Sequence, residues 1–113
     1  MASHLETVAP LFQALADPTR LRAVELLSAA PRRAGQLADE LGVSPPTMSK
    51  HLRVLLQAGV VADERPSDDA RLRVFRLRQE SVVAVRAWLD QLQAHWDEEL
   101  NAFKAHVEQR RRG

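Results

Sequence analysis

Apolar residues recur every three or four positions through the first third of the chain, and this spacing predicts short amphipathic helices. The stripe on the first helix consists of Leu5, Val8, Leu11, Phe12 and Leu15. Asp17 is a good N-cap and Pro18 suits the first position of a helix, so a second helix is expected to start there. This second helix should end before Pro31, and its predicted buried residues are Leu21, Val24 and Leu27.

The next two helices are expected to be joined by a tight turn. A short helix over residues 36–41 ends at Gly42, which tolerates the left-handed backbone of a C-cap. Ser44 can cap the following helix, and the two prolines after it fall in the first turn, where no intrahelical N–H is needed. This helix is expected over about 45–58, with an inner face made of Met48, Leu52, Leu55 and Leu56.

A β-hairpin is expected over about 60–78, after Gly59 has ended the fourth helix. Its second strand is predicted over residues 71–77. The alternation of apolar and polar residues slips between Val74 and Phe75, which leaves open which of the two faces the core.

A long helical pattern begins near residue 80 and continues without proline or glycine to residue 109. Its apolar stripe consists of Val85, Leu89, Leu92, Trp96, Leu100, Phe103 and Val107. Such a helix would be roughly 45 Å long, more than the rest of the chain can cover. Because a large uncovered apolar patch marks an interaction surface, we predict a homodimer. The predicted interface residues are Leu5, Val8, Phe12, Leu92, Trp96, Leu100, Phe103 and Val107.

The expected order of elements is helix, helix, helix-turn-helix, hairpin and helix, which describes a winged helix-turn-helix. The predicted fold class is mainly α with a small β-hairpin, in a single domain over residues 1–113. Its parts are a recognition helix over about 45–58, a wing over about 60–78 and a C-terminal dimerisation helix over about 80–109. Since a helix-turn-helix places its second helix in the DNA major groove, this order predicts a DNA-binding protein.

The fourth helix has the polar outer face that such a role needs, because Lys50 and Arg53 suit guanine or phosphate. The residues predicted to contact DNA are Ser44, Thr47, Ser49, Lys50, His51 and Arg53 in this helix and Arg65, Arg71 and Arg73 in the wing. Asp68 and Asp69 at the tip of the hairpin oppose deep insertion of the wing into a groove. His51 has no second ligand at helical spacing, which favours packing or a phosphate contact over a metal or catalytic role.

Charge and composition narrow the function further. The net charge is only +1, but residues 32–78 carry nine basic and six acidic groups, so the positive excess lies in the middle of the chain. Such a region neutralises DNA phosphates and releases counterions, although the same excess also occurs on ordinary solvated surfaces.

Several function classes are excluded by residues that the chain lacks. It contains no cysteine, which removes disulfides, thiolate metal sites and a cysteine nucleophile. Because no acid/base pair, nucleophile elbow or glycine-rich phosphate loop is present either, we expect neither an enzyme nor a cofactor. The N-terminal residues lack a signal sequence and no window is apolar enough to span a membrane, which predicts a cytoplasmic location without membrane contact.

Three segments together resemble the ArsR/SmtB family of bacterial regulators. They are LADPTRLR at residues 15–22, SKHLRVL at residues 49–55 and AGVV at residues 58–61, and the resemblance covers residues 5–78. It implies a homodimeric winged helix whose dimer contact uses the first and last helices. It also implies an autorepressor that leaves its DNA when an inducer binds.

The metal-ligand residues usual in that family are missing from the matching positions. A cysteine pair used by many members falls on Arg33 and Gly35. The four ligands of a second site fall on Gln79, Ser81, Leu92 and His95, and His95 alone is a candidate ligand. A pair made by His95 and His106 has suitable mutual spacing but lies too far along the helix. We therefore predict no metal site and a repressor released by a non-metal signal.

Two alternatives stay open at this stage. Trp88, Trp96 and Phe103 could line a pocket for an unknown small-molecule inducer, although such a stripe is more often a dimer core. A winged helix can also bind proteins without contacting DNA, but Lys50 and Arg53 disfavour this second function. The predicted partner is double-stranded DNA with an inverted-repeat operator.

Overall fold

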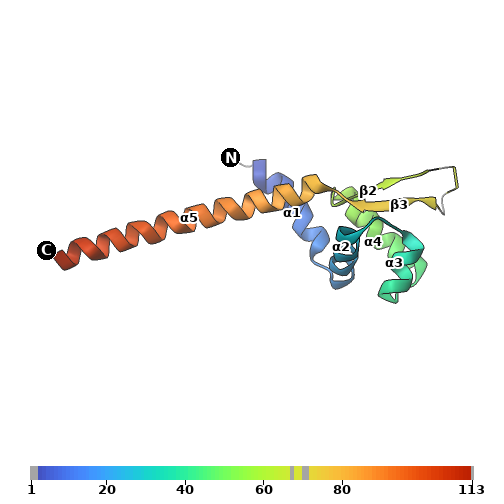
Figure 1. Ribbon diagram of the computed structural model, residues 1–113, viewed down its shortest axis with the longest axis horizontal. Helices are drawn as coiled ribbons and strands as arrows, with labels where there is room; N and C mark the ends of the chain where they lie inside the picture. Colours follow the sequence, from blue (N-terminus) through green and yellow to red (C-terminus); the bar gives the residue numbers. More distant parts are fainter. Residues whose placement is uncertain (1–2, 67, 70–71, 113) are drawn as a thin grey trace.

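The structure is a computed structural model that describes residues 3–66, 68–69 and 72–112, with side chains from residue 6 onward. The elements in this part of the chain are α1 (Ser3–Leu15), α2 (Pro18–Ala29), β1 (Arg32–Arg33), α3 (Ala34–Leu41), α4 (Pro45–Gln57), β2 (Val61–Glu64), β3 (Val74–Leu77) and α5 (Gln79–Arg112). Figure 1 shows a body made of α1 to α4 and the strands, from which α5 projects as a single long helix.

The helix α5 sets the shape of the molecule, whose extents are 75 × 28 × 20 Å. The radius of gyration is 20.2 Å, whereas a compact chain of this length would have about 13 Å. Every residue from 89 to 112 is exposed, so the second half of α5 has no cover from its own chain. Within residues 3–66, 68–69 and 72–112, no helix is apolar over a long enough stretch to cross a bilayer.

Local side-chain caps set the helix boundaries where the sequence predicts them. Oδ1 of Asp17 accepts hydrogen bonds from the backbone N–H groups of Thr19 and Arg20, at 2.8 and 3.1 Å, at the start of α2. Gly42 ends α3 with φ of 67°, the left-handed backbone expected there. The hydroxyl of Ser44 caps α4. The predicted caps at these three positions are confirmed.

The strands form an antiparallel sheet in the order β1-β3-β2. Val61 of β2 pairs with Leu77 of β3, and Arg32 of β1 pairs with Phe75 of β3. The hairpin predicted from sequence is confirmed, but β3 begins at Val74, so the strand predicted over residues 71–77 is shorter than expected. Residue 71 lies outside the described residues, and β1 was not predicted because two arginines show no alternation.

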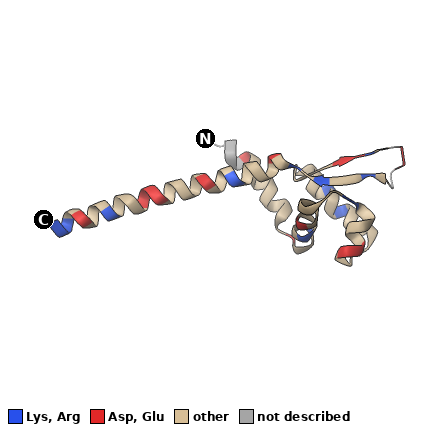
Figure 2. Cartoon of the chain, in the orientation of Figure 1, with Lys and Arg blue, Asp and Glu red and all other residues tan. Residues whose placement is uncertain are grey.

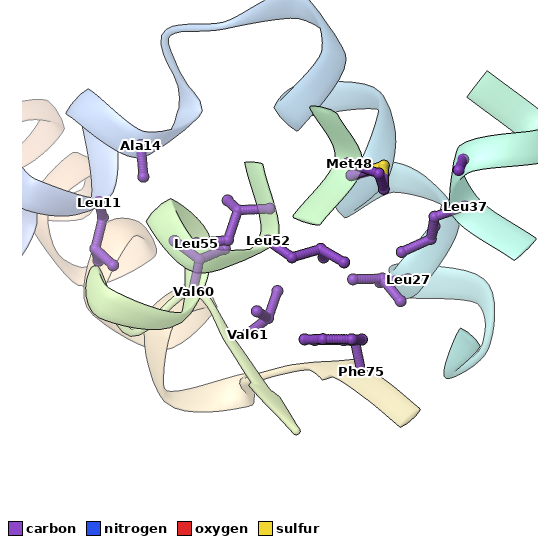
Figure 3. Close-up of a cluster of buried hydrophobic side chains, with 12 residues drawn as sticks. Leu11, Ala14, Leu27, Leu37, Met48, Leu52, Leu55, Val60, Val61 and Phe75 are labelled. Atoms are coloured by element: carbon purple, nitrogen blue, oxygen red, sulfur yellow. The ribbon is translucent and has the colours of Figure 1, made fainter. Parts of the chain in front are cut away.

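One cluster of buried side chains is shared by the four helices α1, α2, α3 and α4 and by the sheet (Figure 3). Its members are Leu11, Ala14, Ala23, Leu27, Leu37, Ala38, Met48, Leu52, Leu55, Val60, Val61 and Phe75. Full burial of a leucine or methionine side chain contributes about 1.5–3 kcal/mol, so the three buried residues of α4 hold that helix firmly against the body. The outer face of α4 is therefore presented in one fixed orientation.

The prediction for the buried face of α2 is partly wrong. Leu21 is 45% exposed and Val24 is half-buried, while Ala23 and Leu27 are buried. Residues four positions apart lie on one side of a helix, and in α2 the side that meets the core is the one with the small Ala23. Periodicity alone does not distinguish this side from the neighbouring one that carries Leu21.

Two helix boundaries differ from the sequence-based expectations, and one question that the sequence left open is answered. The helix α3 begins at Ala34, two residues early, because the side chain of Gln36 accepts a hydrogen bond from the backbone N–H of Arg33 at 2.8 Å. Phe75 is buried and Val74 is half-buried, so Phe75 faces the core. The last helix extends three residues beyond the predicted residue 109, to Arg112.

Candidate nucleic-acid interface

The outer face of α4 carries the polar side chains predicted to contact DNA. Ser49, Lys50 and Arg53 are exposed, and they have no hydrogen bond or ion pair to other residues in the described part of the chain. The helix contains these two cations and no acidic residue. Its outer face is therefore cationic, rigidly held and free of internal partners.

Ser44 and Thr47, at the start of α4, are engaged with each other. The Ser44 hydroxyl donates to Oγ1 of Thr47 at 2.8 Å, and its oxygen accepts from the Thr47 backbone N–H at 3.3 Å. The DNA contact predicted for Ser44 therefore competes with its role as the cap of α4. The Thr47 hydroxyl accepts in this pair and keeps its own proton for donation.

His51 lies on the side of α4 that meets the corner between α1 and α2. Its Nδ1 is 3.2 Å from Nη1 of Arg20, and Nε of the same arginine donates to the carbonyl oxygen of Ala14 at 2.5 Å. Nδ1 of His51 is therefore engaged with this guanidinium inside the fold. The packing role considered for His51 is supported, and only its Nε2 is left for the predicted phosphate contact.

Asp17 belongs to the same corner. The backbone N–H groups of Arg20 and Thr19 donate to its carboxylate, and together with the nearby Arg20 charge they hold the pKa of Asp17 below its ordinary value. The sequence predicts Asp17 as a cap but gives no local signal for a role of Arg20. Only the motif resemblance, which includes Arg20, pointed to this position.

The cations of the wing differ from one another in their surroundings. Arg65 is exposed just beyond β2 and has no partner among the described residues. Arg73 lies directly before β3, where its Nε donates to Oδ2 of Asp63 at 2.5 Å and its guanidinium carbon lies 4.8 Å from the centre of the Phe75 ring. Arg73 was predicted to contact DNA, and its charge is already paired with Asp63 in this structure. Arg71 lies outside the described residues.

A cleft of about 480 Å³ separates α4 from the first turn of α3 and from β3. Its lining residues are Ala34, Gly35, Ser49, Leu52, Arg53, Leu56, Arg73 and Phe75. The buried Leu52 and Phe75 make its base apolar, whereas Ser49, Arg53 and Arg73 supply polar and cationic groups. The sequence did not predict this cleft, because its walls come from segments far apart in the chain.

Charge is distributed differently on the remaining elements. Figure 2 shows acidic and basic segments distributed along the whole of α5. At the end of α3 the acidic Glu40 forms an ion pair with Arg32, so one of the two arginines of β1 is neutralised within the fold. Near α4, cations without an ion pair among the described residues are Lys50 and Arg53 of α4, Arg33 at the start of α3 and Arg65 of the wing.

Some of the residues predicted to form a dimer interface are exposed in the single chain, and others are already buried within it. Val8 is wrong as a main contributor, because it is 2% exposed and already packed within its own chain. Phe12 is 39% exposed and packs edge-on against Trp88, with ring centres 5.3 Å apart. The side chain of Leu5 is not among those described. The exposed members of the set are Phe12, Leu92, Trp96, Leu100, Phe103 and Val107.

The aromatic residues of α5 line neither the cleft beside α4 nor a second, apolar groove. Trp96 and Phe103 are 61% and 65% exposed, and Trp88 rests on Phe12. An apolar groove of about 260 Å³ lies instead where α1, α2 and α5 meet. Its lining residues are Leu11, Leu15, Val24, Val60, Leu77, Ser81, Val82, Val85, Arg86 and Leu89.

The histidines do not gather into a metal site in the described part of the chain. No group of three or more histidine, aspartate, glutamate or cysteine side chains there could hold a metal ion. His95 faces Glu99 one turn along α5, with 4.0 Å between Nε2 and Oε1. Two candidate ligands on an exposed helix do not form a structural site.

Comparison with known proteins agrees with this geometry. The family model of the bacterial regulatory proteins of the arsR family matches residues 17–63. The chain is 40% identical over 92 residues to the HTH-type transcriptional regulator Rv2034 of Mycobacterium tuberculosis, a match that covers 81% of this chain and 80% of that relative. It is also 40% identical over 55 residues to the transcriptional repressor SdpR of Bacillus subtilis, covering 49% of this chain and 61% of the repressor.

Solved structures show the same fold. An ArsR-like transcriptional regulator from Rhodococcus sp. RHA1 superposes with a TM-score of 0.76 at 30% identity, covering 88% of this chain and 92% of that structure. The homodimeric winged helix-turn-helix DNA-binding domain Mb0332 of Mycobacterium bovis gives a TM-score of 0.63 at 30% identity, covering 88% and 86%. The predicted winged helix-turn-helix is thereby confirmed. Because these relatives are regulators, the prediction that the chain is not an enzyme is confirmed as well. The chain belongs to the ArsR family of bacterial regulatory proteins.

Proposed function

We propose that the protein is a sequence-specific transcriptional repressor that binds an inverted-repeat operator as a homodimer. The observation that carries the proposal is the outer face of α4, where Ser49, Lys50 and Arg53 are exposed and unpaired among the described residues. The inner face of the same helix is buried, so these side chains project from a fixed support. In the major groove, arginine and lysine would bind guanine edges or phosphates.

The wing and the cleft fit this placement of α4. A recognition helix in the major groove and a wing at the neighbouring minor groove leave one DNA strand running between them. The 480 Å³ cleft lies between these two elements, and its polar residues Ser49 and Arg53 would face the phosphates of that strand. Arg65 would add a further phosphate contact from the wing.

The dimer would use the uncovered apolar residues of α5. In this proposal residues 1–113 act as one domain, and α5 supplies the contact that sets two copies of α4 about 34 Å apart on successive major grooves. Burying an exposed leucine or phenylalanine contributes about 1.5–3 kcal/mol, so the stripe on α5 would dominate association. Truncation after Asp90 should give a monomer or an aggregate with weak operator affinity, measured by sedimentation and gel shift. A truncated protein that stays dimeric would place the interface elsewhere.

The signal that releases the protein from DNA is proposed to be something other than a metal ion, such as a small molecule. The lack of a ligand cluster within the described residues supports this. Zinc, cadmium and arsenite should leave a preformed protein–DNA complex intact in a gel-shift titration. Release at stoichiometric metal would overturn the proposal. Because the operator of a bacterial regulator lies on the chromosome, we place the protein in the cytoplasm.

Footprinting on the DNA upstream of the protein's own gene tests the function directly. We expect two protected half-sites related by inversion, with centres about one helical turn apart. Protection by an Arg53→Ala variant should need a roughly fivefold to 150-fold higher protein concentration, whereas Gln57→Ala, at an exposed position at the far end of α4, should protect like wild type. Equal protection by both variants would remove α4 from the recognition role.

A second function, protein binding without DNA contact, would also use a winged helix. It would favour an acidic or apolar outer face on α4, whereas this face carries two cations and no acid. Absence of protection on any genomic fragment, together with an intact dimer, would favour that second function.

A further inference from the structure

The apolar groove at the junction of α1, α2 and α5 is a second concave site, separate from the outer face of α4. Its volume is about 260 Å³, and it lies where α1 packs against α5 (Figure 1). Neither Lys50 nor Arg53 is among its lining residues. A ligand in this groove would therefore leave the DNA-binding face of α4 uncovered.

The walls of the groove are almost entirely aliphatic. Eight of its ten lining residues are leucines and valines. Val82 and Leu89 at its rim are 44% and 51% exposed, so the chain itself does not fill this surface. The hydroxyl of Ser81, which also lines the groove, already donates to the carbonyl oxygen of Arg78 at 2.6 Å. The walls therefore suit an apolar tail that needs no hydrogen bonds.

Arg86 gives the groove one cationic edge. It is the one charged residue among the described residues that line the groove. Its side chain is exposed and has no hydrogen bond or ion pair to other residues in the described part of the chain. An aliphatic wall that ends at an unpaired guanidinium is complementary to an amphiphile with an anionic head, because arginine binds carboxylates strongly.

The volume of the groove limits the length of the tail. About eight groups the size of a water molecule, at about 30 Å³ each, fill 260 Å³. A methylene group has a similar size, so the groove accommodates a single alkyl chain of medium length. A free alkyl carboxylate meets this limit, whereas a two-tailed lipid exceeds it.

The groove is linked to α4 through Arg20. Leu11 and Leu15 of α1 line the groove, and Ala14 lies between them in the sequence. The carbonyl oxygen of Ala14 accepts from Nε of Arg20, whose Nη1 lies 3.2 Å from Nδ1 of His51 in α4. A tail seated against α1 would press on the turn that carries Ala14 and so disturb the contact that fixes α4.

We propose that the groove binds a free medium-chain alkyl carboxylate, with its tail on the aliphatic walls and its head group at Arg86. This ligand is the signal that releases the protein from DNA. The release step rests on the proposed function, whereas binding to the free protein does not require DNA. A ligand releases DNA only if it binds the free protein more tightly than the DNA-bound form, and the linkage through Arg20 provides that difference.

Decanoate is the probe, and calorimetry on the full chain without DNA measures its binding. The affinity should rise about fourfold for each methylene added from hexanoate to decanoate, because each added group is buried in the groove. Decyltrimethylammonium has the same ten-carbon tail, about the longest the groove would hold, but a cationic head. It should bind more weakly than decanoate. Equal affinity for the two head groups, or no dependence on chain length, would overturn the proposed site.

Val82→Asp tests the position of the site, with Val83→Asp as the matched control. Both residues are exposed near the start of α5, but only Val82 lines the groove. Val82→Asp should weaken decanoate binding about tenfold or more, because an apolar contact is lost and the new carboxylate repels the ligand. Val83→Asp should bind decanoate like wild type. Equal effects of the two aspartates would place the ligand elsewhere and overturn the site.

Arg86→Gln tests the contact with the head group. Because an exposed ion pair contributes little, decanoate affinity should fall by up to about fivefold, and Arg86→Lys should restore most of it. Binding of decyltrimethylammonium should not fall in Arg86→Gln. An equal loss for both probes in Arg86→Gln would show that Arg86 supports the groove without binding the head group.

Release from DNA is measured separately, by gel shift on the operator that footprinting identifies. Saturating decanoate should raise the Kd of wild type for the operator about fivefold to 150-fold, and that of Val82→Asp much less. In Arg20→Lys decanoate should still bind, but it should raise the Kd by a smaller factor. An unchanged Kd in wild type at saturating decanoate would overturn the release step. If no operator is found, the proposed function fails, and calorimetry still decides the site.

Sedimentation distinguishes this ligand from a second copy of the chain in the groove. The wild-type protein should keep the same oligomeric state with and without decanoate. Dissociation of a dimer by decanoate would show that the groove is covered by the partner subunit, and would overturn the proposed site.

Discussion

Nη1 of Arg20 lies 3.2 Å from Nδ1 of His51, although the two residues are 31 positions apart in the sequence. The same guanidinium donates from Nε to the carbonyl oxygen of Ala14. One side chain of α2 therefore links the end of α1 to α4, the helix that we propose enters the major groove. The contact fixes α4 relative to α1 and α2.

Replacement of Arg20 by lysine should weaken this link. A lysine has no planar fork and cannot reach both acceptors in the same geometry, so Arg20→Lys should lower the free energy of unfolding by about 1–2 kcal/mol. Urea denaturation measures the change. Arg22→Lys, at an exposed position of the same helix, is the control and should be nearly neutral. Equal stability of the two variants would show that the Arg20 contact contributes little.

Lys50→Ala and Arg53→Ala should each weaken operator binding without unfolding the protein. Loss of a base contact costs about 1–3 kcal/mol, which corresponds to roughly a fivefold to 150-fold rise in Kd. Gel shifts at one fixed salt concentration measure the affinity, and thermal melting verifies the fold. Gln57→Ala serves as the control within α4. Full affinity of both lysine and arginine variants would contradict the proposed role of this helix.

The two described arginines of the wing should respond differently to alanine substitution. Arg65 is unpaired among the described residues, so Arg65→Ala should reduce the salt dependence of DNA binding by about one phosphate contact. Arg73→Ala should change the salt dependence less, because Asp63 already neutralises the guanidinium of Arg73. Titrations on non-specific DNA over a range of salt concentrations give both slopes. An equal loss in the two variants would show that Arg73 leaves Asp63 when DNA binds.

Asp17 should contribute to stability in a pH-dependent way. Its pKa is lower in the folded chain than its ordinary value, chiefly because the backbone N–H of Arg20 donates to the carboxylate. The contribution is therefore complete above the ordinary value and is lost as the pH falls below about 4. Asp17→Ala should lower the Tm at pH 7, and the difference from wild type should shrink in acid.

The Asp17→Asn variant separates the contribution of the capping hydrogen bonds from that of the negative charge. Asparagine keeps a capping oxygen but does not titrate, so this variant should be more stable than Asp17→Ala at pH 7 and should show a weaker pH dependence than wild type. A constant difference between wild type and Asp17→Ala from pH 7 to pH 3 would contradict the assigned cause.

Much of the fold follows from the sequence because its determinants are local. The caps at Asp17 and Ser44 bond to backbone N–H groups two or three residues later, and Gly42 meets the conformational demand of its own position. The inner face of α4 also follows, since a helix with one strong apolar stripe has only one side to bury. For the same reason the sequence alone showed that α5 carries more apolar surface than the chain can cover.

Other features depend on which surfaces meet, and periodicity carries no information about that. The apolar stripe of α1 does not indicate that Val8 packs inside the chain while Phe12 stays partly exposed. The weak stripe of α2 likewise does not exclude Leu21 from the predicted buried face. The pairing of Arg73 with Asp63 arises because antiparallel strands bring distant residues into register. The contact between Arg20 and His51 likewise exists only once α2 and α4 have packed. Sequence determined the elements and their apolar faces, whereas tertiary packing decided which polar side chains remain free to bind a partner.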